Sequence, residues 1–332
     1  MKAIIEQLLG REDLTRDKAY QVMLRIMSGE FDDAQTAGFL IALRAKGETP
    51  AEVAGFAQAM REKMTPVSIS SEAIDMCGTG GDARGTFNIS TAASIVAAGA
   101  GVKVAKHGNR SMTSRSGSAD VLTALGVDIA MPPEKMARCV DEIGLGFLFA
   151  PALHPAMKHA IGARKSLAVR TVFNILGPLC NPAGVKRQVI GVFGGELTQP
   201  LAEVLRLLGA EEAYVVHGQD GMDEFTTTAS SLVSHLDPTG KIESMTLSPR
   251  DFDLETTTLE SLQGGDPSEN ATIIRSVLEG EKGPRRDVVV LNAAAGIAVG
   301  GKAATIREAI PLAAESIDSG AALNVLEKLA RA

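Results

Sequence analysis

The chain has 332 residues and a mass of 34.6 kDa, which favours two domains, or one domain with an added lobe. Hydrophobic residues make up 45% and charged residues 22% of the sequence, which is an ordinary globular composition. The net charge of −7, from 33 basic and 40 acidic residues, argues against a general nucleic-acid binder, whose affinity depends on neutralising phosphates. A local basic pocket for an anionic small molecule is compatible with this charge.

The cysteines and the N-terminus indicate the compartment. Cys77, Cys139 and Cys180 are odd in number and lack the paired spacing of a metal site, so we expect reduced thiols. The first residues are amphipathic and charged, unlike a signal peptide, and no apolar run approaches the ~20 residues of a membrane span. We therefore expect a soluble, cytoplasmic protein with no membrane partner.

Residues 1–65 have the periodicity of four short helices. Thr49, Pro50 and Glu52 supply a helix N-cap, a first-turn proline and a capping-box acid. The pattern ends before a linker near residues 66–71. A helical block without a strand partner predicts a packing or dimerisation lobe.

From residue 72 onwards, short apolar runs alternate with helical patterns. We expect strands at 73–77, 101–106, 146–151, 188–195 and 213–218, and helices at 92–100, 118–126, 132–144, 200–209 and 305–332. Two further runs, 231–236 and 241–247, suggest an antiparallel hairpin. Such alternation predicts a mostly parallel central sheet with helices on its faces.

The predicted fold class is therefore α/β, with a small all-helical N-terminal lobe and a larger α/β domain. The lobe comprises residues 1–65, joined by helices near 155–180 that interrupt the sheet pattern, and the larger domain comprises residues 72–332. In open α/β sheets, ligands bind beyond the carboxyl ends of the strands. Three segments lie at such ends, at 77–91, 106–118 and 217–226, so we expect a site where they meet.

The first of these segments, CGTGGDARGTFNIST, spans residues 77–91 and contains four glycines before a helix start. Glycines let backbone amides approach a ligand, and a helix N-terminus favours negative charge, so the loop suggests a phosphate cradle. It is not a P-loop, and Ala83 breaks the dinucleotide-binding glycine pattern. Ser90 and Thr91 either cap the helix or also contact a phosphate or metal, and the residues alone favour capping.

The second segment combines cations with small hydroxyl residues. Lys106, His107, Asn109, Arg110 and Arg115 lie among serines, threonines and glycines. Cations supply charge while hydroxyls and amides supply directed donors, a mixture that suits a polyanion. We interpret this loop as functional.

The third segment carries the acidic pair Asp223 and Glu224. Adjacent carboxylates on a strand point to opposite faces, so both serve one site only if a turn redirects them. Near bound phosphates such a pair suits Mg²⁺. Arg164 and Arg170 fall in an apolar helical region, where either is a solvated cation or faces the cleft to bind a substrate carboxylate.

Four motifs together resemble one family. DMCGTGGDARGTFNIST (75–91), KVAKHGNRSMTSRSGSADVL (103–122), RTVFNILGPLCNPA (170–183) and VVHGQDGMDE (215–224), in this order and spacing, resemble the anthranilate phosphoribosyltransferase family over essentially the whole chain. The resemblance implies a nucleoside phosphorylase/phosphoribosyltransferase-like fold and transfer of phosphoribose from PRPP to the amine of anthranilate in tryptophan biosynthesis. It also implies Mg²⁺, with two ions when PRPP is bound, and a homodimer formed through the helical lobe.

The resemblance implies the following site residues. PRPP contacts fall on Gly78, Gly81, Asp82, Thr86, Asn88, Ile89, Ser90, Thr91, Lys106, His107, Gly108, Asn109, Arg110, Ser111, Met112, Thr113, Ser114 and Ser118. Anthranilate contacts fall on Gly78, Asn109 and Arg164, and Mg²⁺ ligands on Ser90, Asp223 and Glu224. No general base is assigned, and we expect His107 to shape its loop.

The chain departs from the family pattern at four positions. Ala83 and Ala168 stand where glycine is usual, Arg115 where lysine is common and Cys180 where threonine is common. These changes bear on loop mobility and affinity more than on the reaction. A pyrimidine nucleoside phosphorylase-like enzyme and a nucleic-acid-binding paralogue of the same fold are the alternatives. The acidic pair and the KHGNR segment disfavour the first, and the net charge of −7 disfavours the second.

Overall fold

The computed structural model describes residues 1–111 and 115–332. Residues 1–65 form four helices, α1 (Lys2–Leu9), α2 (Arg16–Met27), α3 (Asp33–Lys46) and α4 (Pro50–Lys63). As expected from the sequence, Thr49 caps α4 and Glu52 completes its capping box. Glu52 is fully buried, accepts the Leu14 amide at 2.8 Å and pairs with Lys46 at 2.9 Å, so this capping acid also ties the loop before α2 to α4.

Within the described residues, seven strands form one sheet in the order β3-β2-β1-β4-β5-β6-β7. The first five strands are parallel to one another, and the last two are added antiparallel. Their bounds are β1 (Ile74–Gly78), β2 (Val104–Gly108), β3 (Leu145–Phe149), β4 (Arg187–Gly191), β5 (Glu212–Gly218), β6 (Ser231–Leu236) and β7 (Ile242–Leu247). The mostly parallel sheet and its terminal hairpin confirm the predicted fold class.

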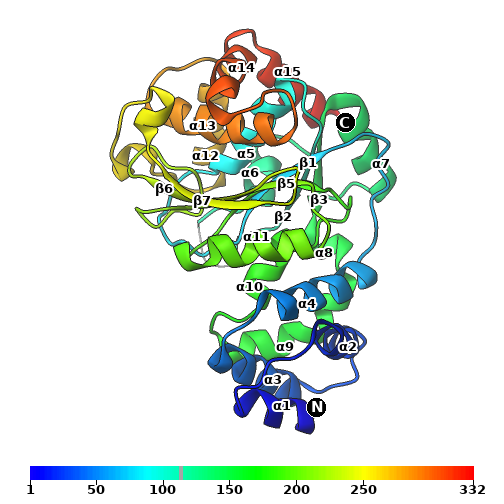
Figure 1. The fold of residues 1–332 in the computed structure, drawn as a ribbon. Coiled ribbons are helices and arrows are strands. Elements are labelled where there is room, and N and C mark those ends of the chain that lie inside the picture. The colour runs from blue at the N-terminus through cyan, green and yellow to red at the C-terminus, as the bar shows by residue number, and fades with distance from the viewer. Residues whose placement is uncertain (112–114) are drawn as a thin grey trace.

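Helices cover both faces of the sheet (Figure 1). On one face α13 packs against α5, β1 and β4, while on the other α11 packs against β5, β6 and α4. The helices after the N-terminal lobe are α5 (Ile89–Gly99), α6 (Ser118–Ala124), α7 (Pro133–Arg138), α8 (Ala150–Leu153), α9 (Lys158–Leu167), α10 (Phe173–Leu176), α11 (Thr198–Leu207), α12 (Pro267–Leu278), α13 (Pro284–Val299), α14 (Ile306–Asp318) and α15 (Ala321–Arg331). No helix in the described part of the chain has the length and apolar character needed to cross a membrane.

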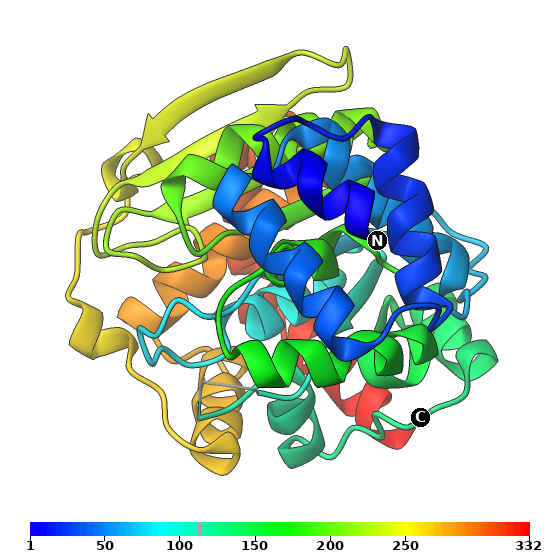
Figure 2. The same ribbon diagram turned by 90° about the horizontal axis from the view of Figure 1, so that it is seen from below.

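The hydrophobic core has two clusters, one on each side of the sheet. One unites the buried faces of α5, α13 and α15 with the sheet. The other runs from α2, α3 and α4 through α10 and α11 to Ile190 and Val215 on the opposite sheet face. α9 packs against α2 and α3, as the view along the molecule shows (Figure 2). The four N-terminal helices and the segment 155–180 are therefore packed together.

Several predicted boundaries were wrong, including the strands predicted at 101–106 and 146–151, which are Val104–Gly108 and Leu145–Phe149, and three others show why. α5 begins at Ile89 rather than residue 92, because Asn88 already accepts the amide of Ala92 in a helical bond. β4 ends at Gly191 rather than residue 195, since the chain turns into a short 3₁₀ helix from Gly195. The segment predicted as one helix at 132–144 is α-helical only as far as Arg138. It continues as a π-helical turn over Cys139–Ile143.

Candidate active site

The carboxyl ends of β1, β2 and β5 lie along one edge of the sheet, and the loops that follow them are bonded together there. The Gly80 amide donates to Oδ2 of Asp223 at 2.8 Å, and the Ser90 amide donates to Oε1 of Glu224 at 3.1 Å. Two of the three predicted segments, 77–91 and 217–226, are thus in direct contact. The third, which follows β2, reaches the same place through Lys106.

Asp223 and Glu224 are half-buried in a turn after β5, so neighbouring carboxylates both face the β1–α5 loop. Desolvation raises the pKa of Asp223, and nearby Asp82 raises it further. Desolvation and the adjacent Asp223 carboxylate likewise raise the pKa of Glu224. Burial is the largest cause of both shifts, and the nearby Lys106 ammonium opposes the shift at Glu224.

Two glycines make room for the acidic pair. A Cβ on Gly191, at the end of β4, would overlap the carbonyl oxygen of Asp223. A Cβ on Gly78, at the end of β1, would overlap Oδ2 of the same residue. Gly78 and Gly191 are paired at the strand ends. Because neither has a side chain, the acidic turn packs directly against their backbone.

Lys106 is 2% exposed and donates to the Met76 carbonyl and, at 3.4 Å, to the Ser90 hydroxyl. Burial lowers its pKa, an effect opposed first by the carboxylate of Asp75. The capping interpretation of Ser90 and Thr91 was wrong. Neither side chain accepts an α5 amide, and the buried Thr91 hydroxyl has no hydrogen-bond partner among the described residues. Thr91 is only 1% exposed, so its unpaired hydroxyl lies inside the first turn of α5 and does not face solvent.

The donor set fits a hard cation. Two half-buried carboxylates with raised pKa values and the Ser90 hydroxyl are the oxygen ligands that Mg²⁺ takes in proteins. Across residues 1–111 and 115–332, no group of three or more His, Cys, Asp or Glu side chains could hold a metal ion. Asp223, Glu224 and Ser90 could therefore hold Mg²⁺ only together with water or substrate oxygens.

Buried polar groups bond to the residues at the end of β2, where the second loop begins. The His107 amide donates to Oδ1 of Asp75 at 3.1 Å, and Asn181 donates to the other oxygen at 2.8 Å. The His107 ring faces His154, with 3.1 Å between their Nε2 atoms. Burial lowers the pKa of His107 to about 3 and that of His154 to about 4, so both rings are neutral at pH 7. This geometry supports the expectation that His107 shapes its loop.

In the rest of this loop, many polar groups form hydrogen bonds or ion pairs with one another. Arg110 pairs with Asp120 at 2.8 Å, and Asp120 also accepts the amides of Ser111 and Gly117. Ser118 donates to the Asn109 carbonyl at 3.3 Å. Arg110 is thus paired within the loop, while its side chain stays 55% exposed. The predicted contacts Met112, Thr113 and Ser114 lie outside the described residues.

The remaining predicted PRPP residues take three different positions. Asn88 donates to the Ser116 carbonyl at 3.1 Å and accepts from Asn270 at 2.9 Å, which joins the first loop to the second. The Ile89 side chain is buried in the core, so only its backbone faces the loop. Thr86 forms a backbone bridge with Gln263. At the carboxyl edge of the sheet Gly81 is exposed, while Asp82 and Gly108 are half-buried.

Arg164 differs from the other arginines of the region. Its side chain is half-buried on α9, with the guanidinium carbon 5.3 Å from the centre of the Phe173 ring. Burial lowers its pKa, and no carboxylate pairs with it in the described part of the chain. A partly desolvated, unpaired guanidinium is suited to bind a planar carboxylate. No hydrogen bond in the described structure joins Arg164 to Asn109 or Gly78, the other residues predicted to contact anthranilate.

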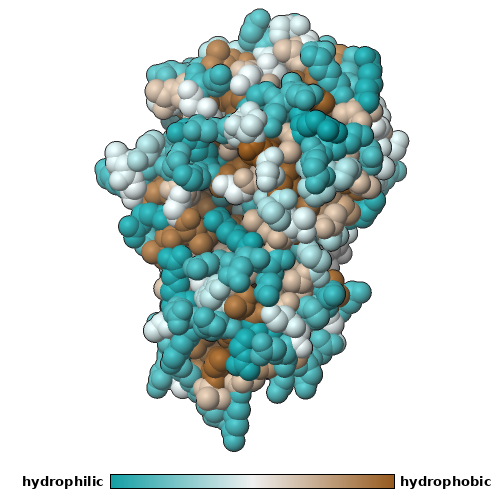
Figure 3. All heavy atoms as spheres, turned by 90° about the vertical axis from the view of Figure 1, so that its right-hand side faces the viewer, coloured by the Kyte–Doolittle hydropathy of each residue, from teal (hydrophilic) through white to brown (hydrophobic). Residues whose placement is uncertain are grey.

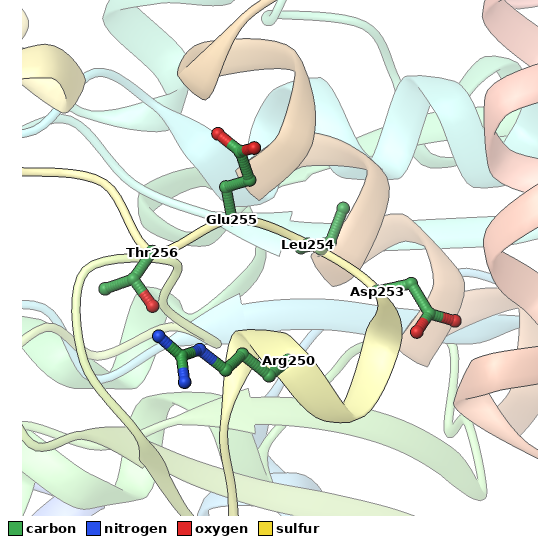
Figure 4. Close-up of a pocket in the computed structure, with 5 residues that line it drawn as sticks. All are labelled: Arg250, Asp253, Leu254, Glu255 and Thr256. Carbon is green, nitrogen blue, oxygen red and sulfur yellow. The ribbon is translucent and has the colours of Figure 1, made fainter.

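A surface pocket elsewhere does not contribute to this site. It has a volume of about 510 Å³ and is lined by Arg250, Asp253, Leu254, Glu255 and Thr256 (Figure 4). None of the predicted site residues lines it. The arrangement of the three loops, and not the pocket in Figure 4, therefore defines the candidate site.

Sequence reasoning missed the contacts of three side chains that support the site, although it named Arg170 as a candidate. Asn181 bridges Asp75 and the Ala105 carbonyl, Gln263 holds the end of the glycine loop, and Arg170 donates to the Gly81 carbonyl. Arg170 and Asn181 lie within the RTVFNILGPLCNPA segment, so their motif was identified but their contacts were not. Gln263 carries no local pattern that would have distinguished it.

Comparisons with known proteins were consistent over the full chain. Residues 2–64 match the helical bundle domain of a glycosyl transferase family, and residues 70–323 match its a/b domain. An anthranilate phosphoribosyltransferase from Geotalea uraniireducens is 49% identical, and the alignment covers 100% of this chain and 99% of that protein.

Solved structures agree with these matches. The anthranilate phosphoribosyltransferase of Thermus thermophilus superimposes with a TM-score of 0.93 at 45% identity, covering 99% of each chain. The enzyme of Saccharomyces cerevisiae, solved in complex with PRPP and Mg, has a TM-score of 0.90 at 31% identity, covering 99% of this chain and 96% of that one. The same yeast enzyme was also solved with 4-fluoroanthranilate, with a TM-score of 0.88 at 31% identity and the same coverage. The family expected from the motifs is confirmed: this chain belongs to the anthranilate phosphoribosyltransferases, a glycosyl transferase family.

Proposed function

We propose that the site described above carries out the family reaction in this chain. It transfers the phosphoribosyl group of PRPP to the amine of anthranilate, giving N-(5-phosphoribosyl)anthranilate and pyrophosphate in tryptophan biosynthesis. The observation that supports it best is the acidic pair, Asp223 and Glu224, bonded to the amides of Gly80 and Ser90 at the carboxyl edge of the sheet. Phosphates bound by the glycine loop would lie beside this pair.

Asp223, Glu224 and Ser90 are the proposed Mg²⁺ ligands, and two ions are proposed when PRPP is bound. When bound, Mg²⁺ supplies positive charge to the pyrophosphate oxygens that take up the electrons of the breaking bond. Lys106 adds a fixed cation beneath them, already oriented by the Met76 carbonyl and the Ser90 hydroxyl. Because these groups are in place before the reaction, they need no reorganisation as charge develops.

The proposed phosphate cradle combines backbone and side-chain donors from two loops. It comprises Gly78, Gly81, Asp82, Thr86, Asn88, Ile89, Ser90, Thr91, Lys106, His107, Gly108, Asn109, Arg110, Ser111, Met112, Thr113, Ser114 and Ser118. Ile89 contributes through its backbone, because its side chain is in the core.

The chemical step replaces one bond to the anomeric carbon by another. The bond from this carbon to pyrophosphate breaks with its electrons, and the anthranilate nitrogen forms the new bond and then loses one proton. An aromatic amine is already neutral at pH 7, so no strong base is needed to prepare it. Correct placement of the two substrates then supplies much of the rate.

Arg164 is proposed to hold the anthranilate carboxylate, with Asn109 and Gly78 near the amine. The support is that Arg164 is half-buried and unpaired among the described residues, whereas Arg110 is already paired with Asp120. A guanidinium and a carboxylate form two parallel hydrogen bonds, which would fix the ring plane of the substrate.

The helical lobe is proposed to mediate a homodimer. We divide the chain into a lobe of residues 1–65, joined by helices near 155–180, and an α/β domain of residues 72–332. Leu9, Ile41 and Ile161, on α1, α3 and α9, are 63%, 40% and 42% exposed. Figure 3 shows hydrophobic surface among hydrophilic residues at the end of the molecule where this lobe lies. We infer a cytoplasmic location for this reaction between two soluble small molecules.

The test is an assay of anthranilate fluorescence with PRPP and Mg²⁺, repeated with EDTA. Loss of fluorescence that requires both PRPP and the metal supports the proposal. Retained fluorescence with folded protein and fresh PRPP contradicts it. Phosphorolysis of thymidine or uridine in a parallel reaction would instead favour the nucleoside phosphorylase alternative.

A further inference from the structure

The two halves of the glycine loop between β1 and α5 differ in how many hydrogen bonds hold them to the rest of the protein. Its second half is bonded to the segment before α12. Gln263 donates to the Arg84 carbonyl at 3.0 Å, the Gly264 amide donates to the Gly85 carbonyl at 2.9 Å, and the Phe87 amide donates to Leu262 at 3.2 Å. These bonds fix the end of the loop that leads into α5.

The first half of the loop has fewer restraints. Gly80 and Gly81 are exposed and both have positive φ values, 67° and 77°. Among the described residues, two contacts reach across to them from other segments: the Gly80 amide donates to Asp223, and Arg170 donates to the Gly81 carbonyl at 2.7 Å. Glycine backbone has wide conformational freedom, so these contacts select the conformation of the tip.

Arg170 contacts three separate segments of the protein. It lies between α9 and α10, six positions after Arg164 in the sequence. Its guanidinium carbon is 4.2 Å from the centre of the Phe193 ring, which follows β4. Its own carbonyl accepts from Arg44 of α3 at 2.6 Å. One residue thus connects the helical lobe, the segment that carries Arg164 and the tip of the glycine loop.

The engaged state of Arg170 separates it from Arg164. Arg164 has a free guanidinium edge, whereas Arg170 is committed to a carbonyl and to an aromatic ring. A guanidinium that bonds a carbonyl while stacked on a ring has a fixed orientation, which suits a structural link.

We propose that Arg170 is a positioning residue that links the two substrate subsites. It holds Gly80 and Gly81 in the conformation that receives PRPP, and it transmits to them any movement of the segment that follows Arg164. Binding of either substrate then favours binding of the other, because both act on one connected element. This inference rests on the proposed function for the identity of the two subsites, but the contact itself does not.

The experiment compares Arg170→Ala and Arg170→Lys with wild type in the full-length protein. Arg25→Ala is the matched control, since Arg25 is an exposed α2 arginine that pairs with Glu30 and stacks on Phe31, and it belongs to no proposed subsite. Backbone amide exchange over residues 79–83 is measured without substrates. Initial rates are measured over a grid of PRPP and anthranilate concentrations.

In Arg170→Ala we expect faster exchange at residues 79–83 and a KM for PRPP raised roughly tenfold, the effect of losing one charge-assisted hydrogen bond. We expect kcat to fall much less. Raising PRPP should lower the KM for anthranilate in wild type, and this dependence should weaken in the variant. Arg170→Lys keeps a donor but loses the flat stack on Phe193, so its values should lie between the two.

Unchanged exchange at residues 79–83, or a PRPP KM within twofold of wild type, would overturn the proposal. So would a loss of thermal stability in both Arg170 variants without any change in substrate coupling, since that describes a purely structural role. Failure of the proposed function is distinguishable, because it removes activity from wild type while leaving the exchange difference intact.

Discussion

The backbone amide of Ser90 donates to the carboxylate of Glu224 across 3.1 Å, although 134 positions separate the two residues in the chain. Ser90 lies in the first turn of α5, where the unpaired amides of a helix carry partial positive charge. The bond therefore places one acid of the pair against the start of a helix that is itself buried between the sheet and α13. The acidic turn and the glycine loop form one unit, and this unit determines the first prediction.

Neutral substitutions of the acidic pair should remove most activity without unfolding the protein. In Asp223→Asn and Glu224→Gln, kcat/KM should fall about 100-fold or more, because the charge that would hold Mg²⁺ beside the leaving group is lost. Magnesium titration of the assay is the measurement, and both variants should need far more metal than wild type. Glu243→Gln, at an exposed acid on β7, is the control. Wild-type metal dependence in both site variants would exclude these residues as ligands.

Removal of the Arg164 guanidinium should act on one substrate only. Arg164→Ala should raise the KM for anthranilate roughly 10- to 100-fold, the range expected when a bidentate charged contact is lost. The KM for PRPP should stay near its wild-type value. Steady-state kinetics with each substrate varied in turn measures both. An equal rise in the two constants would mean that Arg164 supports the site as a whole instead of binding the carboxylate.

Ala168→Gly should stabilise the protein. Ala168 follows α9 in a left-handed conformation, with φ 49° and ψ 27°, where a Cβ costs about 1 kcal/mol. Glycine removes that strain but gains freedom in the unfolded chain, so we expect a net rise in the free energy of unfolding of roughly 0.5 kcal/mol. Urea denaturation measures it. Ser166→Gly, within the same helix, should have the opposite sign, and a loss of stability at both positions would contradict the prediction.

The His107–His154 pair should make the fold sensitive to mild acid. Burial lowers both pKa values, to about 3 and about 4, while an unfolded histidine titrates near 6.5. Below pH 6.5 the unfolded chain therefore binds more protons than the folded one. The associated stability is complete above pH 6.5 and is lost progressively as the pH falls towards the folded-state values.

Urea denaturation of His107→Gln/His154→Gln and wild type between pH 8 and pH 4.5 measures this effect. The wild-type free energy of unfolding should fall more steeply below pH 6.5 than that of the variant. At pH 8 both rings are neutral, so the difference measured there reports lost packing and serves as the internal control. Parallel pH curves for the two proteins would show that these rings do not titrate on unfolding.

The sequence predicted the sheet, the two-part architecture and the meeting of the loops at the carboxyl edge, because alternating apolar runs and strand-end motifs are local signals. The family was confirmed from the same motifs. The role of Ser90 could not be predicted locally, because a serine at a helix start is usually a cap. In the structure the N-cap of α5 is Asn88, and the Ser90 hydroxyl accepts from Lys106. The Arg170 contact depends on the path of the chain between α9 and α10, which no periodicity encodes.

Pairing within the site was also hidden from sequence. The charge of Arg110 suggested a phosphate ligand, but its ion pair with Asp120, ten residues later, appears only in the structure. Ala83 and Ala168 could be identified as departures from a glycine pattern. That both adopt positive φ values, 56° and 49°, required the structure.

Gly191 carries no functional group, yet it determines how closely the acidic turn packs against the end of β4. The Asp223 carbonyl occupies the space against the end of β4 that a Cβ on Gly191 would fill. A single methyl group there would lift the whole turn away from the glycine loop while leaving every polar side chain intact. A member of this family can therefore keep every catalytic and binding side chain and still be inactive, because those side chains no longer lie around one substrate.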